Sequence, residues 1–315
     1  MKDIQNAIAQ LDWKREPFGL YEPIEYILNL GGKRLRPMLA VLASQIFNGD
    51  KQDVLPAALA LEVFHNFTLL HDDVMDKAEV RRGYPTVHTK WDENTAILSG
   101  DQMMIEAYKQ LALLPDDKLP QVLKLFSNTA AEVCEGQQYD IDFEHSTTVS
   151  INDYLMMIEK KTALLLAHSL RIGAYIAGAS TDEQEALYQY GRHIGIAFQI
   201  QDDVLDVYGD PSSFGKAIGG DICCNKKTFL LLTALDIADA ESKAELLQWL
   251  ITSNQNEEKI KAITSIYTRL GVRQIGEAVM EDHTAEALAQ LELLPQNEYT
   301  NHLRELAEKL ATRKR

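Results

Sequence analysis

Apolar residues along this 315-residue chain recur three and four positions apart over long stretches and rarely at every second position. Spacing of three and four places side chains on one face of a helix, whereas strands alternate with a period of two. Strand signals are weak, because β-branched residues are scattered and no Asn-Gly or Asp-Gly turn joins two alternating runs. The pattern predicts long helices at 54–70, 95–114, 119–139, 151–178 and 183–207.

Helix boundaries follow local signals. Pro37 suits the first turn of a helix that runs to about Phe47. Thr181-Asp182-Glu183 suits a helix start, because acidic side chains favour the positive end of the helix dipole. Gly and Pro gather in a few short loops, and no linker rich in Pro, Gly or Ser divides the chain. We therefore expect one all-α domain over residues 1–315, a bundle whose sites lie on facing helices.

The charge of the chain narrows the choice of partner. Hydrophobic residues make up 46% of the chain and the formal net charge is −16. An acidic protein repels nucleic acid, so we expect no nucleic-acid role. A diphosphate substrate would need basic residues concentrated in one place against this background.

Membrane and redox signals are weak. The first ten residues lack the apolar run of a signal peptide. The most apolar segment, 162–179, is interrupted by His168 and Arg171, so we interpret it as a buried helix and expect no transmembrane segment. The three cysteines have no metal-type spacing, which is typical of reduced thiols in a cytoplasmic protein.

Two aspartate-rich segments stand out, Asp72-Asp73-Val74-Met75-Asp76 and Asp202-Asp203-Val204-Leu205-Asp206. On a helix, residues four apart share a face, and Gln199 joins the face of the second segment one turn earlier. Like charges so placed repel one another, and a bound cation would remove that cost. Mg²⁺ is usually held by carboxylates together with substrate phosphates. The alternative is a solvated acidic face, which is less convincing for two segments that each end an apolar run.

Basic residues lie beside both acidic segments in the sequence. A glycine turn with three cations, Gly31 to Pro37, begins a helix, and such a start suits phosphate. Arg81-Arg82 follows the first segment, Lys160-Lys161 interrupts an apolar helix, and Lys216, Lys226 and Lys227 follow the second segment. This placement favours a metal-bridged diphosphate site. A capped helix start would explain the first cluster alone.

His65 is the one histidine with a supporting pattern. It lies seven residues before Asp72, which is two helical turns back on the same face. It is a candidate substrate contact.

Together these motifs resemble the trans-type isoprenyl diphosphate synthases, which make farnesyl, geranylgeranyl and longer polyprenyl diphosphates. The matching pieces, in order, are GGKRLRP at 31–37, LLHDDVMD at 69–76, RRGYPTVH at 81–88, KT at 161–162, FQIQDDVLD at 198–206, and GKAIGGDI followed by NKKT at 215–228. The resemblance implies an all-α helical bundle around a deep central cavity, usually in a homodimer.

The resemblance also implies roles for individual residues. Three Mg²⁺ ions would be held mainly by Asp72, Asp76 and Asp202, with Asp73, Asp203 and Asp206 in support. Isopentenyl diphosphate would be held by Lys33, Arg36, His65 and Arg82. The allylic diphosphate would be held by Arg81, Lys161, Lys216 and Lys226. Thr162 and Gln199 would face the reacting carbon. Lys161, Thr162 and Gln199 would be the catalytic residues.

The implied reaction condenses isopentenyl diphosphate with dimethylallyl, geranyl or farnesyl diphosphate to give geranylgeranyl or farnesyl diphosphate. Metal ions would assist ionisation, and the carbocation would need a closed, apolar site. Phe67 beside the small Thr68 resembles the geranylgeranyl-forming pattern, so we expect Phe64 and Phe67 to form the cavity floor. Core packing of both rings is the alternative.

Other functions fit less well. A terpene cyclase would have a different second metal motif and no GGKRLRP cluster. A non-catalytic partner subunit would lack the aspartate segments, and a metal-storage bundle would carry Glu-x-x-His pairs. The basic end of the chain, residues 312–315, suits a helix C-terminus, or alternatively a tail that folds over bound isopentenyl diphosphate.

Overall fold

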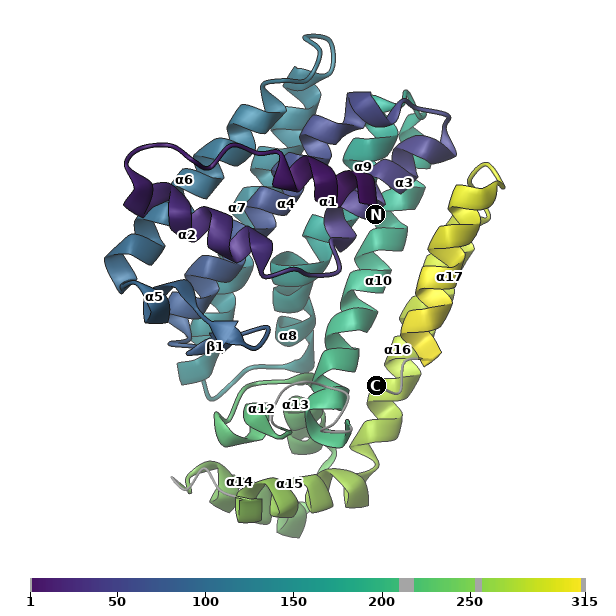
Figure 1. The fold of residues 1–315 in the computed structure, drawn as a ribbon. Helices are drawn as coiled ribbons and strands as arrows, with labels where there is room; N and C mark the ends of the chain where they lie inside the picture. The colour runs from purple at the N-terminus through teal and green to yellow at the C-terminus, as the bar shows by residue number, and fades with distance from the viewer. Residues whose placement is uncertain (1, 210–217, 253–256, 313–315) are drawn as a thin grey trace. The chain divides into compact units, whose positions relative to one another are not determined.

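The computed structural model describes residues 2–209, 218–252 and 257–312, and this part of the chain is almost entirely helical (Figure 1). Within these ranges the regular strands form a single two-stranded ribbon. The all-α fold class predicted from the apolar spacing is confirmed.

Two compact units make up the chain, each assembled from separate segments. The first unit holds residues up to Asn128 together with His168–Tyr188 and Leu294–Thr300. The second holds Thr129–Ala167, Gln189–Leu293 and the residues from Asn301. A single domain over the whole chain remains a prediction. Four helices have residues in both units: α7 (Leu119–His145), α9 (Leu164–Ile176), α10 (Thr181–Tyr208) and α17 (Glu298–Thr312).

The first unit is organised around α4 (Lys51–Met75), which packs against α3 and α6. This helix begins where the Asp50 side chain accepts a hydrogen bond from the backbone N–H of Gln52, and such a cap satisfies one of the free donors of a helix start. Its middle is fully buried, so the residues at its C-terminal end are carried on a rigid support. The other helices are α1 (Lys2–Ala9), α2 (Phe18–Asn29), α3 (Leu35–Ile46), α5 (Val87–Lys90) and α6 (Glu93–Leu111).

A short hairpin follows α4, although the strand signals in the sequence are weak. Strands β1 (Val80–Arg81) and β2 (Tyr84–Pro85) pair antiparallel. The two turn residues, Arg82 and Gly83, have φ of 55° and 81°, as a tight hairpin with a positive φ at both positions requires. An arginine at the first turn position gave no hairpin signal in the sequence.

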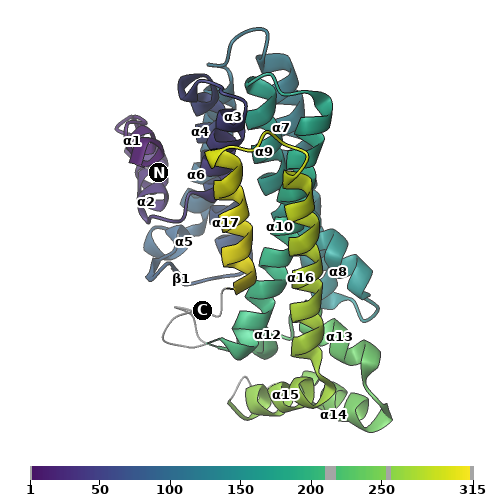
Figure 2. The ribbon, with the colours of Figure 1, turned by 90° about the vertical axis from the view of Figure 1, so that its right-hand side faces the viewer.

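The second unit surrounds α13 (Phe229–Ile237), which packs against α8, α15 and α16. Its core includes Tyr154, Ile200, Leu230 and Tyr267. In this unit, α16 and α17 run beside α10 (Figure 2). The other elements are α8 (Ile151–Ile158), η1 (Glu159–Ala163), α12 (Gly220–Cys223), α14 (Ala240–Leu250), α15 (Glu257–Leu270) and α16 (Val272–Leu291).

The segment predicted as one helix over 151–178 is interrupted. One turn of π-helix, η1, separates α8 from α9. Such turns occur mostly as single insertions in α-helices and are frequent at functional sites. Apolar spacing alone does not reveal this turn, because it shifts the helical phase by only one residue.

Among the described helices, α4 alone is long and apolar enough to cross a membrane, with a mean hydropathy of 1.3 in its most apolar window. This helix, and not the predicted segment 162–179, is therefore the one that meets the membrane criterion. In this structure 67% of that window is buried inside the protein, as in an ordinary core helix. The absence of a transmembrane segment stays a prediction.

Candidate active site

One buried arginine holds the glycine-rich loop in front of α3. Arg34 is 7% exposed and has a positive φ of 47°. Its guanidinium donates to Glu62 Oε1 at 2.5 Å and to the carbonyl of Leu28. A buried charge is stable only with such partners, so Arg34 fixes the loop between α2 and α4.

The two predicted ligands on either side of Arg34 have different surroundings. Lys33 is exposed. Arg36 has a buried Nε with no hydrogen-bond partner among the described residues. Burial lowers the pKa of Arg36 to about 10, with Glu62 opposing the shift and Arg82 adding to it. The side chain therefore stays charged at neutral pH and keeps a donor available for an anion.

Arg82 reaches the same loop from the hairpin turn. Its guanidinium donates to the carbonyl of Gly31. A Cβ on Gly32, which has φ of 138°, would lie 2.9 Å from Arg82 Nη2. Gly32 is therefore needed both for its backbone conformation and for the space that the guanidinium occupies.

His65 lies among these guanidinium groups. Burial, followed by Arg36, Arg82, Arg81 and Arg34, holds its pKa well below 6.5, so the imidazole is neutral at pH 7. We call these four side chains the arginine group. Arg81 is opposed by Asp73, Asp72 and Asp76. Arg34, Arg36 and Arg82 have mainly the single carboxylate of Glu62 among them, so these three keep a local cationic surplus. In a chain with a net charge of −16, such a surplus is suited to a bound polyanion.

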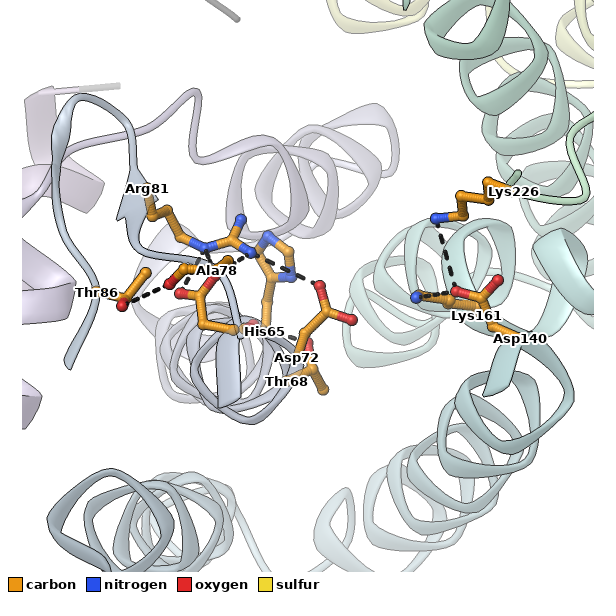
Figure 3. Close-up of polar contacts among 10 residues, drawn as sticks. His65, Thr68, Asp72, Ala78, Arg81, Thr86, Asp140, Lys161 and Lys226 are labelled. Carbon is orange, nitrogen blue, oxygen red and sulfur yellow. Dashed lines mark hydrogen bonds and ion pairs between the residues drawn. The ribbon is translucent and has the colours of Figure 1, made fainter. Parts of the chain in front are cut away.

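Arg81 joins the arginine group to the aspartates at the end of α4. Its Nε donates to both carboxylate oxygens of Asp73 at 2.8 Å, and its Nη2 lies 3.6 Å from Asp72 Oδ2 (Figure 3). Burial raises the pKa of Asp73, and Arg81 opposes the shift. Asp73 is thus occupied by Arg81, while Asp72 is half-buried and Asp76 is exposed.

The carboxylates fit a hard divalent cation in their chemistry. Among the described residues, no three Asp, Glu, His or Cys side chains already converge as a metal cage. Mg²⁺ needs no such cage, since it is usually held by one or two carboxylates plus substrate phosphates and waters. Asp72 and Asp76 at the end of α4, and the half-buried Asp202 on α10, can supply such oxygens.

In the second unit, the π-turn η1 is held between two glycines. A Cβ on Gly136 of α7 would lie 2.4 Å from the backbone nitrogen of Lys161. A Cβ on Gly195 of α10 would lie 2.4 Å from Ala163 Cα. Side chains at either position would push the helices apart, so the glycines bring the π-turn into close contact with both.

The close approach at Gly136 places Asp140, one turn further along α7, against two predicted ligands. Lys161 Nζ lies 2.6 Å from Asp140 Oδ2 and Lys226 Nζ lies 3.8 Å from it (Figure 3). Burial raises the pKa of Asp140, but Lys226 and Lys161 outweigh it, so the pKa is lowered overall. The third predicted lysine of this set, Lys216, lies outside the described residues.

The structure brings the two residues predicted to face the reacting carbon together. Thr162 Oγ1 lies 3.3 Å from Gln199 Oε1, and Gln199 Nε2 lies 3.3 Å from Asp203 Oδ1. Gln199 lies one turn before the second segment on α10, and its amide donates to Asp203.

The aspartates of the second segment have unequal surroundings. Asp203 is 4% exposed, and burial, reinforced by Asp221, raises its pKa to about 7. Asp206 accepts a hydrogen bond from the backbone N–H of Asp221 at 3.1 Å, at the start of α12. Asp202 is half-buried. Asp206 therefore has a structural task at the start of α12.

The two phenylalanines predicted at the cavity floor also differ. Phe64 is fully buried and its ring packs 5.2 Å from Phe126. Phe67 is 7% exposed, and its ring lies 5.5 Å from Phe64 and 4.7 Å from His71. Phe64 is thus part of the packed core behind Phe67.

Sequence reasoning missed Glu62, Asp140 and Gly136. Glu62 and Asp140 are single carboxylates without a repeated pattern, so nothing in the sequence marks them. Gly136 carried a usable signal, since a glycine inside a helical pattern costs stability and often marks a close approach.

Comparison with known proteins defines the class. Residues 18–267 match the family model described as Polyprenyl synthetase. A short chain isoprenyl diphosphate synthase of Methanocaldococcus jannaschii is 44% identical over 248 residues, which cover 78% of this chain and 76% of that protein. The chain therefore belongs to the polyprenyl synthetase family. It is a prenyltransferase that condenses isopentenyl diphosphate with an allylic diphosphate.

Solved structures agree. The crystal structure of a geranylgeranyl pyrophosphate synthase has a TM-score of 0.93 and 43% identity, covering 100% of this chain and 99% of that one. A polyprenyl synthase of Caulobacter crescentus, complexed with calcium and isoprenyl diphosphate, has a TM-score of 0.90 and 28% identity, covering 100% and 96%. The resemblance stated from the motifs is confirmed.

Proposed function

We propose that this prenyltransferase extends an allylic diphosphate to geranylgeranyl diphosphate, with isopentenyl diphosphate held by Lys33, Arg36, His65 and Arg82. The observation that carries the proposal is the four guanidinium groups around a neutral imidazole, beside the carboxylates of α4. Like charges so close together repel one another, and a bound diphosphate would turn that repulsion into attraction.

Arg36 would be the central contact of this site. Its Nε is buried without a partner among the described residues, and a buried unsatisfied donor is costly unless a ligand satisfies it. Arg82 and Lys33 would reach the same diphosphate from the hairpin and the loop. Neutral His65 would donate or accept one hydrogen bond without adding to the crowded positive charge.

The allylic diphosphate would be bound by Arg81, Lys161, Lys216 and Lys226, and Asp72, Asp76 and Asp202 would hold three Mg²⁺ ions against it. Bound Mg²⁺ neutralises the leaving diphosphate and so favours its departure. Asp140 lies against Lys161 and Lys226. It would keep the two ammonium groups close together until the diphosphate arrives.

Thr162 and Gln199 would stabilise the allylic cation. Both present oxygen atoms, and their dipoles can be arranged before the charge develops. The double bond of isopentenyl diphosphate would attack the cation, and the proton would pass to the released diphosphate. A side chain that acts as base is not required.

Phe67 would stop growth at about four isoprene units. Phe67 is slightly exposed and Phe64, which packs against it, is fully buried. This supports a cavity floor made of the Phe67 ring with the Phe64 ring behind it.

We also propose a cytoplasmic homodimer. Ile97, Leu98 and Ile105 of α6 are 40%, 60% and 53% exposed, which supports an apolar contact with a second copy. Light scattering should give twice the mass of the chain, and the monomer mass would exclude this assembly.

The test of the isopentenyl site is the substitution Arg36→Met. We expect the KM for isopentenyl diphosphate to rise about 10-fold or more, which is the effect of losing a charged hydrogen bond. The KM for the allylic substrate should change little. Arg171→Met is the matched control, because Arg171 pairs with a half-exposed Glu185 in the same unit. An unchanged KM for isopentenyl diphosphate in Arg36→Met would reject the proposed site.

A further inference from the structure

Gln199 is the middle member of a hydrogen-bond chain that starts in the core of the second unit. The hydroxyl of Tyr154 on α8 donates to Asp203 Oδ2 at 2.5 Å. The other oxygen of the same carboxylate accepts from Gln199 Nε2, and Gln199 Oε1 faces Thr162 Oγ1. The chain thus joins α8, α10 and the π-turn η1.

The carboxylate of Asp203 is held in one orientation. Besides the tyrosine hydroxyl, Oδ2 accepts from the backbone N–H of Phe229 at 3.0 Å, at the start of α13. Two donors on Oδ2 prevent the group from rotating and leave Oδ1 directed at Gln199. Asp203 is 4% exposed and Tyr154 is 2% exposed, so water does not easily replace either partner.

This fixed acceptor decides which end of the Gln199 amide points where. When Asp203 is ionised, as it is above its pKa of about 7, an amide turned by 180° would place its oxygen against Asp203 Oδ1, and the two acceptors would repel each other. The NH₂ end is therefore held by Asp203, and the oxygen end points toward Thr162. The Thr162 hydroxyl then donates its only hydrogen to the Gln199 oxygen. The two lone pairs of the threonine oxygen point away from Gln199.

We propose that Tyr154 is a positioning residue for the condensation, fixing through Asp203 the Gln199 carboxamide so that its oxygen, and not its NH₂, faces the allylic cation. This inference rests on the roles proposed above for Gln199 and Thr162. A carbonyl dipole stabilises a neighbouring positive charge only in one direction, and a preset dipole costs no reorganisation when the charge forms. Burial, followed by Asp203, raises the pKa of Tyr154 well above 10, so its hydroxyl stays a donor at working pH.

The chain offers a matched control for removing a buried tyrosine hydroxyl. Tyr190 lies on the same helix as Gln199, is fully buried, and donates to the carbonyl of Leu303 at 2.7 Å. Tyr154→Phe and Tyr190→Phe therefore each remove one hydroxyl and one buried hydrogen bond from the same unit. They differ in that the first hydroxyl is connected to Gln199 through Asp203.

The experiment measures kcat and both KM values of the full-length enzyme with Mg²⁺, isopentenyl diphosphate and farnesyl diphosphate. For Tyr154→Phe we expect kcat to fall about 10-fold or more, which is typical when a residue that orients a catalytic ligand is removed. Both KM values should stay within about twofold of the wild-type values. Loss of a hydrogen bond to a substrate would raise the KM for that substrate by more than this. Tyr190→Phe should retain the wild-type kcat. Equal kcat in the two phenylalanine variants would overturn the inference.

A double substitution tests whether Tyr154 acts through Gln199. In a Gln199→Leu background, Tyr154→Phe should cause no further loss of kcat, because the group that it positions is gone. A purely structural role would lower kcat by the same factor in both backgrounds and would contradict the inference.

If Tyr154→Phe does not fold, Asp203→Asn provides a second route. The asparagine oxygen can keep the Tyr154 and Phe229 donors while its NH₂ turns toward Gln199 and reverses that amide. A loss of kcat at an unchanged allylic KM is expected, and an unchanged kcat would refute the inference. Inactivity of the wild-type enzyme would instead refute the proposed function.

Discussion

Asp202 and Asp206 are the first and last aspartates of the second segment, and their surroundings differ. Asp206 accepts the backbone N–H of Asp221, whereas Asp202 is half-buried and proposed as a metal ligand. We expect Asp206→Ala to lose less activity than Asp202→Ala, and to unfold at lower temperature because the start of α12 loses an acceptor. Steady-state rates and thermal unfolding of the two variants check this. A larger loss of activity in Asp206→Ala would reverse the assignment.

Phe67 and Phe64 also differ in burial, so we expect different effects when each is replaced by alanine. Phe67→Ala should lengthen the product beyond four isoprene units, because it opens space in front of Phe64. Phe64→Ala should mainly destabilise the first unit, by about 3–5 kcal/mol for a buried ring. Chromatography of the dephosphorylated products measures the first effect, with the exposed Phe18→Ala as control. An unchanged chain length in Phe67→Ala would exclude it as the floor.

His168 gives a pH dependence with a defined sign. Burial, followed by Arg171, lowers its pKa to about 4. Between that value and the ordinary 6.5, the unfolded chain takes up a proton that the folded chain does not, so the free energy of unfolding falls as pH decreases through this window. The loss from pH 7 to pH 5 from this residue is about 2 kcal/mol.

The variant His168→Phe isolates this contribution, since a phenyl ring can keep the edge contact with Tyr188. Urea unfolding at pH 7 and pH 5 should show a smaller loss of stability in the variant than in the wild type. The same loss in both proteins would show that His168 does not cause it.

At the scale of elements, the sequence pattern located α4, α6, α7, α10 and the helical run over 151–178, but it did not single out α16, which at 20 residues is longer than α6. It also placed Pro37 in the first turn of α3 and the start of α10 at Thr181. The capping pair Ser180 and Glu183 explains the start of α10. The pattern did not reveal the π-turn or the hairpin. The π-turn depends on packing against Gly136 and Gly195. The hairpin depends on Arg82 adopting a positive φ. Both are set by tertiary contacts and not by local spacing.

The π-turn makes a prediction for Gly136→Ala. The added Cβ would lie 2.4 Å from the backbone of Lys161, so α7 must move away from η1 and Asp140 must leave Lys161. We expect a loss of about 1–3 kcal/mol in stability, together with a rise in the KM for the allylic diphosphate. Denaturant unfolding and kinetics measure the two effects.

Gly19→Ala is the matched control, because nothing lies within 4 Å of a Cβ at that helical position. It should be neutral or slightly stabilising, since alanine favours a helix by up to about 1 kcal/mol over glycine. Equal stability of the two variants would show that α7 and η1 are not closely held by Gly136.

For the whole molecule, the chain could be assigned from its sequence to an all-α fold and to a family, because the aspartate and glycine motifs are short, ordered and specific. The partners of those motifs could not be assigned. Arg34 with Glu62, and Lys161 with Asp140, are joined over 28 and 21 residues, and single charges carry no signal of such distant pairing. The division into two compact units is likewise a property of contacts and not of composition.

The most direct test of the whole account is product formation by the purified enzyme. Incubated with Mg²⁺, labelled isopentenyl diphosphate and farnesyl diphosphate, it should yield labelled geranylgeranyl diphosphate, and no product when EDTA is present. A cyclic hydrocarbon, or product formed only when a second, different chain is added, would contradict the account.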